Sequence, residues 1–519
     1  MDRQRFLIPA LALLTVWRLA LLPTIELSPD EALALFYTKH PALWYLEMGP
    51  LVPWLVKLGT LIAGEGALGV RLFAPFLALA ATLCLWRLVR GLLGLGVAAW
   101  AVLLLQVLPA FNVAAISMTS SIVGLALVLG LMTSLRYALQ RSAVWNVGWW
   151  LAALCLLGAI LADWRYGLAY GCTGLALGLP RRRRHHLLAP GFALITSAFV
   201  IGISLMVTWN VSLGWPIWDG GEAEPAWHLF PNVLRWMILL SPVVMTLLVW
   251  SLMRYLPRWR GWSADELLLP TFMLPFALLD FGWGPREHWP HTGFILWLAP
   301  AMALLADQTL VELRLEMRRK ILLRSGAIFI AGLQSMVLMR TDMLRSVGII
   351  WPFQKEVAAG LDYRHFLWAD PSSGMRGWEQ SAGVLNGVLA GTHQPDAPKW
   401  FIIARDWPLA VGLEWSLPAA ATLLQPNPQH PRVHVIQTPE RTSPHALLPR
   451  YDELRDAQSA FAGRNALYVT DAAAMRPPAE IRSSFERTEA LSHARLMHGG
   501  QEVRTIKIFA CYGYKPPDL

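Results

Sequence analysis

Two adjacent acids, and a third close behind them, are the residues of this sequence best suited to chemistry. Asp30 and Glu31 lie in the segment LSPDEALALFYTKH, and Glu47 follows in YLEMGPLVPW. Carboxylates that share one loop can act as a general base and as an orienting or metal-binding partner. Ser28 and Pro29 favour a helix that begins just before Asp30, so the first two acids could instead only complement the helix dipole. Local sequence leaves both interpretations open.

A few isolated cations are candidates for binding an anion. Arg165, Arg286 and Lys39 lie between apolar runs in segments that hold few other cations. An arginine can bind a phosphate group through two parallel hydrogen bonds. We predict that these three side chains bind an anionic substrate group. The alternative is an ordinary ion pair, such as Arg165 with Asp163 or Arg286 with Glu287.

The composition places these residues in a membrane protein. Of the 519 residues, 55% are hydrophobic and only 15% are charged, whereas soluble domains carry about 25% charged residues. The 26 tryptophans suit repeated crossings of the headgroup region. The net charge of +9 comes from short basic clusters between apolar runs, which argues against a nucleic-acid partner. The four cysteines offer neither a disulfide framework nor a CxxC metal site.

Apolar runs predict the elements that must position the candidate residues. A helix that spans a bilayer needs about 20 mostly apolar residues. We predict about 11 transmembrane helices, near residues 6–24, 69–90, 94–111, 120–139, 144–162, 165–180, 188–208, 232–253, 264–281, 290–306 and 323–341. The apolar run 50–64 is shorter and contains two early prolines, so we predict an interfacial or re-entrant segment there.

The loop charges predict one orientation for all of these spans. Clusters such as the run Arg181–Arg184 fall on one side, which the positive-inside rule makes cytoplasmic. The N-terminus is then cytoplasmic, and the first outer loop, 25–68, carries the acids on the other side. We therefore expect a multi-pass protein of a bacterial inner membrane with a periplasmic active site.

A change in composition divides the chain in two. We expect residues 1–344 to form the transmembrane domain. In 345–519, prolines, histidines and charges become frequent, and short apolar runs such as 400–404 and 466–469 alternate with helix-like stretches. This alternation predicts a soluble C-terminal α/β domain, which the topology places outside the membrane.

The first outer loop resembles a known family. The run DEALALFYTKHPALWYLEMGPLVPWLVKLGTLIAGEGALGVRL (30–72) is similar to the first outer loop of lipid-dependent glycosyltransferases of the GT-C fold. These are the glycosyltransferase family 39 enzymes in the broad sense, including protein O-mannosyltransferases and aminoarabinose-transferase-like enzymes. WNVSLGW (209–215) and REHWPHTGF (286–294) resemble later motifs of the same family. The similarity covers about residues 1–310.

The resemblance implies roles for particular residues. Asp30 would be the base that deprotonates the acceptor, with Glu31 and Glu47 shaping the site. Arg71, which lies in the family-like Val-Arg-Leu segment, would join the phosphate-binding cations. Substrate-binding positions implied in the same way are Tyr37, His288 and Trp289. No cofactor is implied with certainty, although Glu47 and His288 could together hold a divalent metal. His288 could equally be an interfacial residue.

The resemblance also implies a reaction. The enzyme would move a sugar from a polyprenyl-phosphate donor in the bilayer to an extracytoplasmic glycolipid, glycan or protein, with inversion at the anomeric carbon. The family often has Thr-Pro-Asp where this chain has Met118-Thr119-Ser120-Ser121, which puts the donor head group in doubt. The alternatives are a non-catalytic transporter of isoprenoid lipid or polysaccharide and a catalytically inactive scaffold that binds the lipid. The sugar, the acceptor and the oligomeric state do not follow from the sequence.

Overall fold

The computed structural model describes about two thirds of the chain, and its described residues fall into two compact units. These residues are 3–45, 47–141, 145–212, 242–255, 265–283, 294–311, 377–392, 400–405, 407–418, 432–435, 461–471, 476–498 and 501–515. The first unit comprises Met1–Thr24 and Tyr37–Met339, and the second comprises Ile25–Phe36 and Arg340–Leu519. Each unit is described separately.

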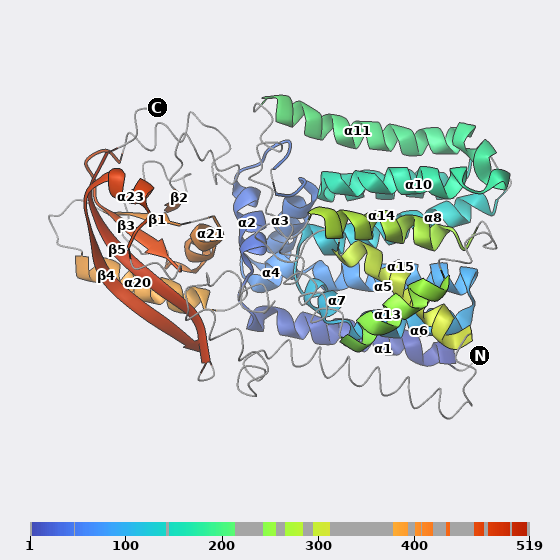
Figure 1. Cartoon of the computed structure of the whole chain (residues 1–519), viewed down its shortest axis with the longest axis horizontal. Coiled ribbons are helices and arrows are strands. Elements are labelled where there is room, and N and C mark those ends of the chain that lie inside the picture. Colours follow the sequence, from blue (N-terminus) through green and yellow to red (C-terminus); the bar gives the residue numbers. More distant parts are fainter. Residues whose placement is uncertain are drawn as a thin grey trace. The chain divides into compact units, whose positions relative to one another are not determined.

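The first unit is helical (Figure 1). Its described elements are α1 (Arg3–Leu21), η1 (Leu22–Thr24), α3 (Leu51–Ala63), α4 (Ala67–Arg71), α5 (Ala74–Leu92), α6 (Leu95–Val107), α7 (Pro109–Ala114), α8 (Ser120–Leu139), α9 (Val147–Ala162), η2 (Trp164–Gly167), α10 (Leu168–Gly178), η3 (Arg181–Leu188), α11 (Pro190–Ser212), α13 (Pro242–Tyr255), α14 (Leu268–Trp283) and α15 (Phe294–Val311). Helix α8 packs between α5 and α9, and α9 also packs against α11. This packing buries α8, on which small and apolar residues such as Gly124 and Leu125 alternate.

Several of these helices coincide with the predicted spans. Within the described residues, α4 with α5 (residues 67–92), α8 and α11 are each long and apolar enough to cross a membrane. Residues Ile8–Thr24 and the helix Pro29–Lys39 make a fourth if that bent pair counts as one span. Helices α9, α13, α14 and α15 lie on other predicted spans. The predicted span 323–341 lies outside the described residues. The structure therefore supports a multi-pass helical protein and does not confirm the count of eleven.

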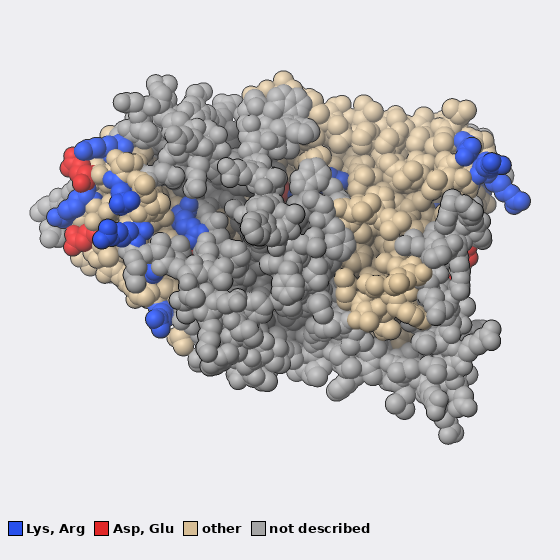
Figure 2. All heavy atoms as spheres, viewed as in Figure 1, with Lys and Arg blue, Asp and Glu red and all other residues tan. Residues whose placement is uncertain are grey.

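The surface of the helical unit fits a lipid environment. Figure 2 shows its described surface as largely uncharged along the helices, with basic residues gathered at one end of α10 and α11. The segment that joins these two helices is η3, in which Arg181 and Arg182 are exposed. Large apolar side chains also face outward, such as Leu154, which is 64% exposed. Apolar side chains can remain exposed where the surrounding solvent is lipid.

The predicted span 94–111 is broken, because Pro109 cannot continue the hydrogen-bonding of the preceding helix. Helix α6 ends at Val107 and α7 begins at Pro109. The break brings Asn112 to Arg18 of α1, whose guanidinium donates to Asn112 Oδ1 at 3.0 Å and to Gln106 Oε1 at 2.9 Å. A buried cation in a membrane protein needs such polar partners.

The second unit contains a five-stranded mixed sheet. Its described elements are α20 (Trp378–Thr392), β1 (Phe401–Ala404), α21 (Trp407–Ser416), β2 (Val433–Val435), β3 (Ala466–Thr470), α23 (Ala479–Ser483), β4 (Phe485–His498) and β5 (Gln501–Tyr514). The strand order is β2-β1-β3-β5-β4. Strand β1 pairs in parallel with β2 and β3, whereas β5 is antiparallel to β3 and β4. The described residues therefore show a small C-terminal sheet together with helices, as the sequence predicted.

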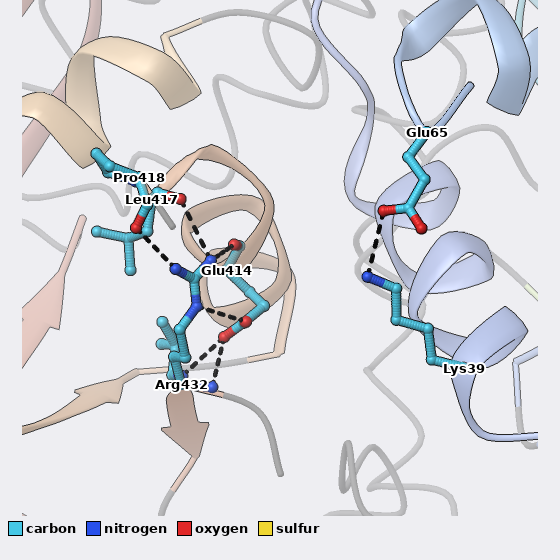
Figure 3. Close-up of polar contacts among 7 residues, drawn as sticks. Lys39, Glu65, Glu414, Leu417, Pro418 and Arg432 are labelled. Atoms are coloured by element: carbon cyan, nitrogen blue, oxygen red, sulfur yellow. Dashed lines mark hydrogen bonds and ion pairs between the residues drawn. The ribbon is translucent and has the colours of Figure 1, made fainter. Parts of the chain in front are cut away.

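Both faces of this sheet are packed. On one face the aromatic rings of Phe401, Tyr468 and Phe509 join a core that also holds Phe461 and Cys511. The alternate residues of the same strands, such as Ile402 and Ile508, are also fully buried. The start of β2 is fixed to the end of α21, since the Arg432 side chain bonds Glu414 at 3.0 Å and the Pro418 carbonyl at 2.9 Å (Figure 3).

Helix α2 (Pro29–Lys39) begins in the second unit and ends in the first. The sequence predicted that the whole first outer loop, 25–68, belongs to the transmembrane domain 1–344. In the structure, Ile25–Phe36 groups instead with the residues from Arg340 onward. The predicted boundary at 344/345 falls in a stretch outside the described residues and stays a prediction.

Candidate active site

The start of α2 holds the first two candidate acids. Ser28 precedes the helix, its backbone N–H donates to Glu31 Oε2 at 2.9 Å, and its hydroxyl donates to the same oxygen at 3.0 Å. The Glu31 backbone N–H in turn donates to Ser28 Oγ at 3.4 Å. This reciprocal pattern is a capping box, which satisfies polar groups left open at a helix N-terminus. Pro29 sits at the first helical position, where its missing N–H has no cost.

The capping box separates the roles of the two acids. Glu31 is fully buried, and its carboxylate holds the helix start together. Asp30 is only half-buried. An acid that accepts a proton from a substrate must be reachable, so this arrangement favours Asp30 for chemistry and Glu31 for positioning. Neither acid's predicted catalytic role is tested by the structure alone.

Glu47 is held by a tyrosine from α2. The Tyr37 hydroxyl donates a hydrogen bond to Glu47 Oε2. The Tyr37 ring stacks on Tyr45 with centroids 4.1 Å apart. The Tyr45 hydroxyl accepts from the Ala42 N–H and donates to the backbone carbonyls of Tyr37 and His40. Both rings are buried. The structure therefore brings together Tyr37 and Glu47, which the sequence had singled out separately. Tyr45 is a supporting residue that the sequence did not single out.

The Glu47 loop rests on the end of α9. The Gly49 N–H donates to the Ala162 carbonyl at 2.8 Å. A side chain at position 49 would overlap the Leu161 carbonyl oxygen, so this close approach requires glycine. Asp163, Trp164 and Arg165 follow Ala162 along the chain. The structure therefore brings the Glu47 loop and this predicted anion-binding segment of the helical unit together.

Arg165 forms an ion pair with Asp163, which was the alternative to anion binding that the sequence left open. Its Nε and Nη2 atoms donate to the two carboxylate oxygens of Asp163, at 2.9 and 2.8 Å. Asp163 is buried and also accepts the Arg165 backbone N–H at 2.9 Å, while the Arg165 side chain is 31% exposed. Two parallel hydrogen bonds fix the orientation of a guanidinium group, including the part of it that stays exposed. Phosphate binding by Arg165 stays a prediction.

The other predicted cations lie in different surroundings. Arg71 is 1% exposed, and its Nη1 donates to the Leu22 carbonyl at 3.3 Å, which favours a structural role at the junction of α4 and η1. Lys39 is exposed and pairs with the exposed Glu65 at 3.4 Å (Figure 3). Such a pair contributes little to stability, so Lys39 can release Glu65 for a stronger anion at little cost.

Three predicted residues, Arg286, His288 and Trp289, lie outside the described residues. The predicted metal pair Glu47 and His288 is therefore untested. Among the described residues, no group of three or more metal-binding side chains is found. The Glu47 carboxylate, which already accepts from Tyr37, is the part of the predicted metal site that the structure shows.

These features define a class of protein: a multi-pass helical membrane protein of the GT-C fold, with acids in the segment after its first helix and a C-terminal mixed sheet. ArnT from Cupriavidus metallidurans shares this fold, with a TM-score of 0.53 in its apo state at 16% identity over 98% of each chain. Its structure bound to undecaprenyl phosphate gives a TM-score of 0.52 at 16% identity over 97% of each chain.

Within this class, residues 39–209 match the model of the family described as dolichyl-phosphate-mannose-protein mannosyltransferase. The resemblance predicted from the sequence is thereby confirmed. The archaeal oligosaccharyltransferase AglB from Archaeoglobus fulgidus, in complex with an inhibitory peptide and a dolichol-phosphate, aligns with a TM-score of 0.49 at 10% identity over 91% of this chain and 70% of that one. No curated protein matches the chain.

Proposed function

We propose that this protein is a membrane glycosyltransferase that transfers a sugar from a polyprenyl-phosphate donor to an extracytoplasmic acceptor. The observation that carries the proposal is the family match over residues 39–209, a segment that includes Glu47 and Arg165. A fold shared with a protein whose structure was determined with undecaprenyl phosphate supports a lipid-linked donor. The charge pattern of the loops supports a bacterial inner membrane with the site on the periplasmic side.

The proposed reaction is a single displacement. An acceptor hydroxyl or amine attacks the anomeric carbon while the bond from that carbon to the phosphate oxygen breaks, and the polyprenyl phosphate leaves with the electron pair. Asp30 takes the proton from the acceptor. One displacement inverts the anomeric centre. A carboxylate next to α2's capping box is well fixed for this task, since the helix start that carries it is held at both Ser28 and Glu31.

The leaving phosphate needs positive charge. We propose that Arg165 and Lys39 supply it from the helical unit, together with Arg286 from outside the described residues. Arg165 is oriented by Asp163, and Lys39 is available because its pair with Glu65 is exposed. Charged donors aimed at a developing negative charge are among the largest contributions to catalysis. Tyr37 would hold Glu47 for substrate binding or for a divalent metal shared with His288.

The test is transfer by the purified full-length protein. Undecaprenyl-phosphate sugars would be offered with membranes as acceptor, and Asp30→Asn compared with the unchanged protein. We expect turnover to fall at least about 100-fold in Asp30→Asn, because general acid–base catalysis contributes roughly 10²–10⁴-fold. Glu489→Gln, at an exposed position on β4, is the matched control and should keep full turnover. Full turnover by Asp30→Asn would reject the base assignment. Tight lipid binding without transfer by the unchanged protein would favour a transporter or scaffold.

A further inference from the structure

We propose that the sheet-containing unit positions Asp30, through a hydrogen bond from the start of α20 to Glu26. This inference rests on the proposed function, because it concerns the proposed base. It assigns a positioning role to Glu26, a residue four positions before Asp30 that belongs to no predicted catalytic or binding set. The residues on which this inference rests all lie in the second unit.

Glu26 caps a helix that lies far away in the sequence. The backbone N–H of Trp378, the first residue of α20, donates to Glu26 Oε2 at 2.8 Å, and the Glu379 N–H is a second backbone donor to this carboxylate. The first N–H groups of a helix have no partners within the helix, and a carboxylate there also complements the helix dipole. The residue before α20 is Gly377, which has no side chain to act as a cap, and Glu26 supplies one from the segment 25–36.

Trp378 is a rigid anchor for this bond. It is 2% exposed, and the guanidinium of Arg504 on β5 lies 3.5 Å from the centroid of its ring. On another side, Gly412 of α21 approaches the ring so closely that any side chain at 412 would overlap it. Strand β5 and helix α21 therefore both fix the residue whose N–H holds Glu26. A cation stacked on a buried tryptophan is a strong contact.

The path from Glu26 to Asp30 is short and ordered. Leu27 is 2% exposed and Ser28 is 6% exposed, so both residues between the anchor and the helix are buried. Ser28 then enters the capping box with Glu31. No flexible residue separates the Glu26 carboxylate from the first turn of α2. A displacement at Glu26 must therefore move the start of α2, and with it Asp30. Misplacing a catalytic group by about 1 Å can cost about 10²-fold in rate.

The competing explanation is that Glu26 only stabilises the second unit. Two measurements separate these roles: kcat against KM in sugar transfer, and hydrogen–deuterium exchange of peptides covering 25–36 and 377–392. Glu26→Ala removes the acceptor, whereas Glu26→Gln keeps an oxygen that can accept from Trp378. Gln380→Ala is the matched control, because Gln380 also lies on α20 and bonds only the Met497 carbonyl in the described contacts.

We expect Glu26→Ala to raise exchange in residues 25–36 and to lower kcat by about 10-fold or more, with KM for the donor nearly unchanged. Glu26→Gln should keep kcat within a few-fold, and Gln380→Ala should behave as the unchanged protein. Increased exchange without a fall in kcat would overturn the proposal, as would an equal fall in Gln380→Ala. If Glu26→Ala does not fold, Glu26→Gln decides the question alone. A kcat of about a hundredth of the original in Glu26→Gln would overturn the proposal. A retained kcat, together with low exchange in residues 25–36, would support it.

The exchange experiment does not depend on the enzyme assay. If the protein transfers no sugar, the proposed function fails while the difference in exchange between Glu26→Ala and Glu26→Gln still reports whether α20 holds the segment. If transfer occurs and Asp30→Asn abolishes it, but Glu26→Ala leaves both exchange and kcat unchanged, only the positioning role fails.

Discussion

At the residue scale, the two adjacent acids of the candidate site differ in how exposed their carboxylates are. The Glu31 carboxylate accepts hydrogen bonds from Ser28 and is fully buried, whereas Asp30 is half-buried. The spacing Ser-x-x-Glu was visible in the sequence and is the signature of a capping box. Together with the helix-dipole alternative, this spacing is enough to predict a structural role for Glu31 from the sequence alone.

The capping box predicts a stability effect at Ser28. In Ser28→Ala the Glu31 carboxylate loses the hydroxyl donor and the Glu31 N–H loses its acceptor, so we expect the free energy of unfolding to fall by about 1 kcal/mol. The thermal unfolding midpoint in detergent measures this. Ser204→Ala, at an exposed position on α11, is the control and should leave the midpoint unchanged. Equal midpoints for both variants would show that the box contributes nothing to stability.

The Tyr37–Glu47 pair predicts an effect on activity. Tyr37→Phe keeps the stack on Tyr45 but removes the hydroxyl that donates to Glu47, so the carboxylate is no longer held. We expect kcat/KM to fall about 10-fold, the size of a lost hydrogen bond to a charged group. Steady-state transfer assays measure it.

Tyr45→Phe is the matched control for this change. It removes a hydroxyl from the same stacked pair, but in the described contacts that hydroxyl bonds only backbone groups, those of Tyr37, His40 and Ala42. Its effect should appear mainly in stability. If Tyr45→Phe lowers kcat/KM as much as Tyr37→Phe does, the loop's shape, and not the hold on Glu47, determines activity.

At the element scale, apolar runs predicted most helix positions of the first unit because twenty apolar residues have few alternatives to a helix in a bilayer. The ends and breaks were harder. Pro109 splits one predicted span, although a proline in an apolar run is a direct signal for such a break. Strand β4 was missed because its sequence FERTEALSHARLMH has four consecutive polar residues, 486–489, and no regular polar/apolar alternation. It lies at the sheet edge, where it pairs with β5.

The contact of the Glu47 loop with α9 predicts that Gly49 tolerates no side chain. In Gly49→Ala the new methyl group would overlap the Leu161 carbonyl oxygen, and the backbone around Leu161 cannot move without disturbing the end of α9. We expect a loss of roughly 1–3 kcal/mol in stability and a clear fall in transfer activity. The unfolding midpoint and the transfer rate together measure the effect.

Gly66→Ala is the control for this prediction. Gly66 lies in the same predicted outer loop, its φ of −75° suits any residue, and a side chain there would meet nothing within 4 Å. It should fold and act as the unchanged protein. A Gly49→Ala protein as stable and active as Gly66→Ala would mean that the loop does not rest on α9 as the structure has it.

At the scale of the whole molecule, the sequence predicted two units but not which residues each contains. Residues 25–36 were assigned to the transmembrane domain because they follow the first apolar run directly. The structure groups them with residues more than three hundred positions away, among them Trp378, whose N–H donates to Glu26. Such a pairing depends on tertiary packing and leaves no periodic pattern in one sequence. The candidate acids were found from the sequence, whereas their supports, Glu26 and Tyr45, needed the structure.

The same bond predicts a dependence of stability on pH. Burial raises the pKa of Glu26 above its ordinary value and the nearby Glu379 raises it further, while the N–H groups of Trp378 and Glu379 and the charge of Arg504 act in the opposite direction. The net shift is upward, so the folded unit binds a proton at Glu26 more tightly than the unfolded chain does. The contribution of Glu26 to stability is then fully present below the pKa of the unfolded chain, and it declines as the pH rises through the pKa of the folded state.

Glu26→Gln, which mimics the protonated acid, isolates this contribution. The quantity of interest is the unfolding midpoint of Glu26→Gln minus that of the unchanged protein. We expect this difference to be smallest in acid and to increase as the pH rises above the ordinary pKa range of a glutamate. It should level off once Glu26 is ionised in the folded protein. Scans of thermal unfolding in detergent across this range measure the difference, and Glu489→Gln on exposed β4 should give a flat line. A difference that decreases with rising pH would mean that the hydrogen bonds and Arg504 outweigh burial, and that Glu26 is held as a carboxylate throughout.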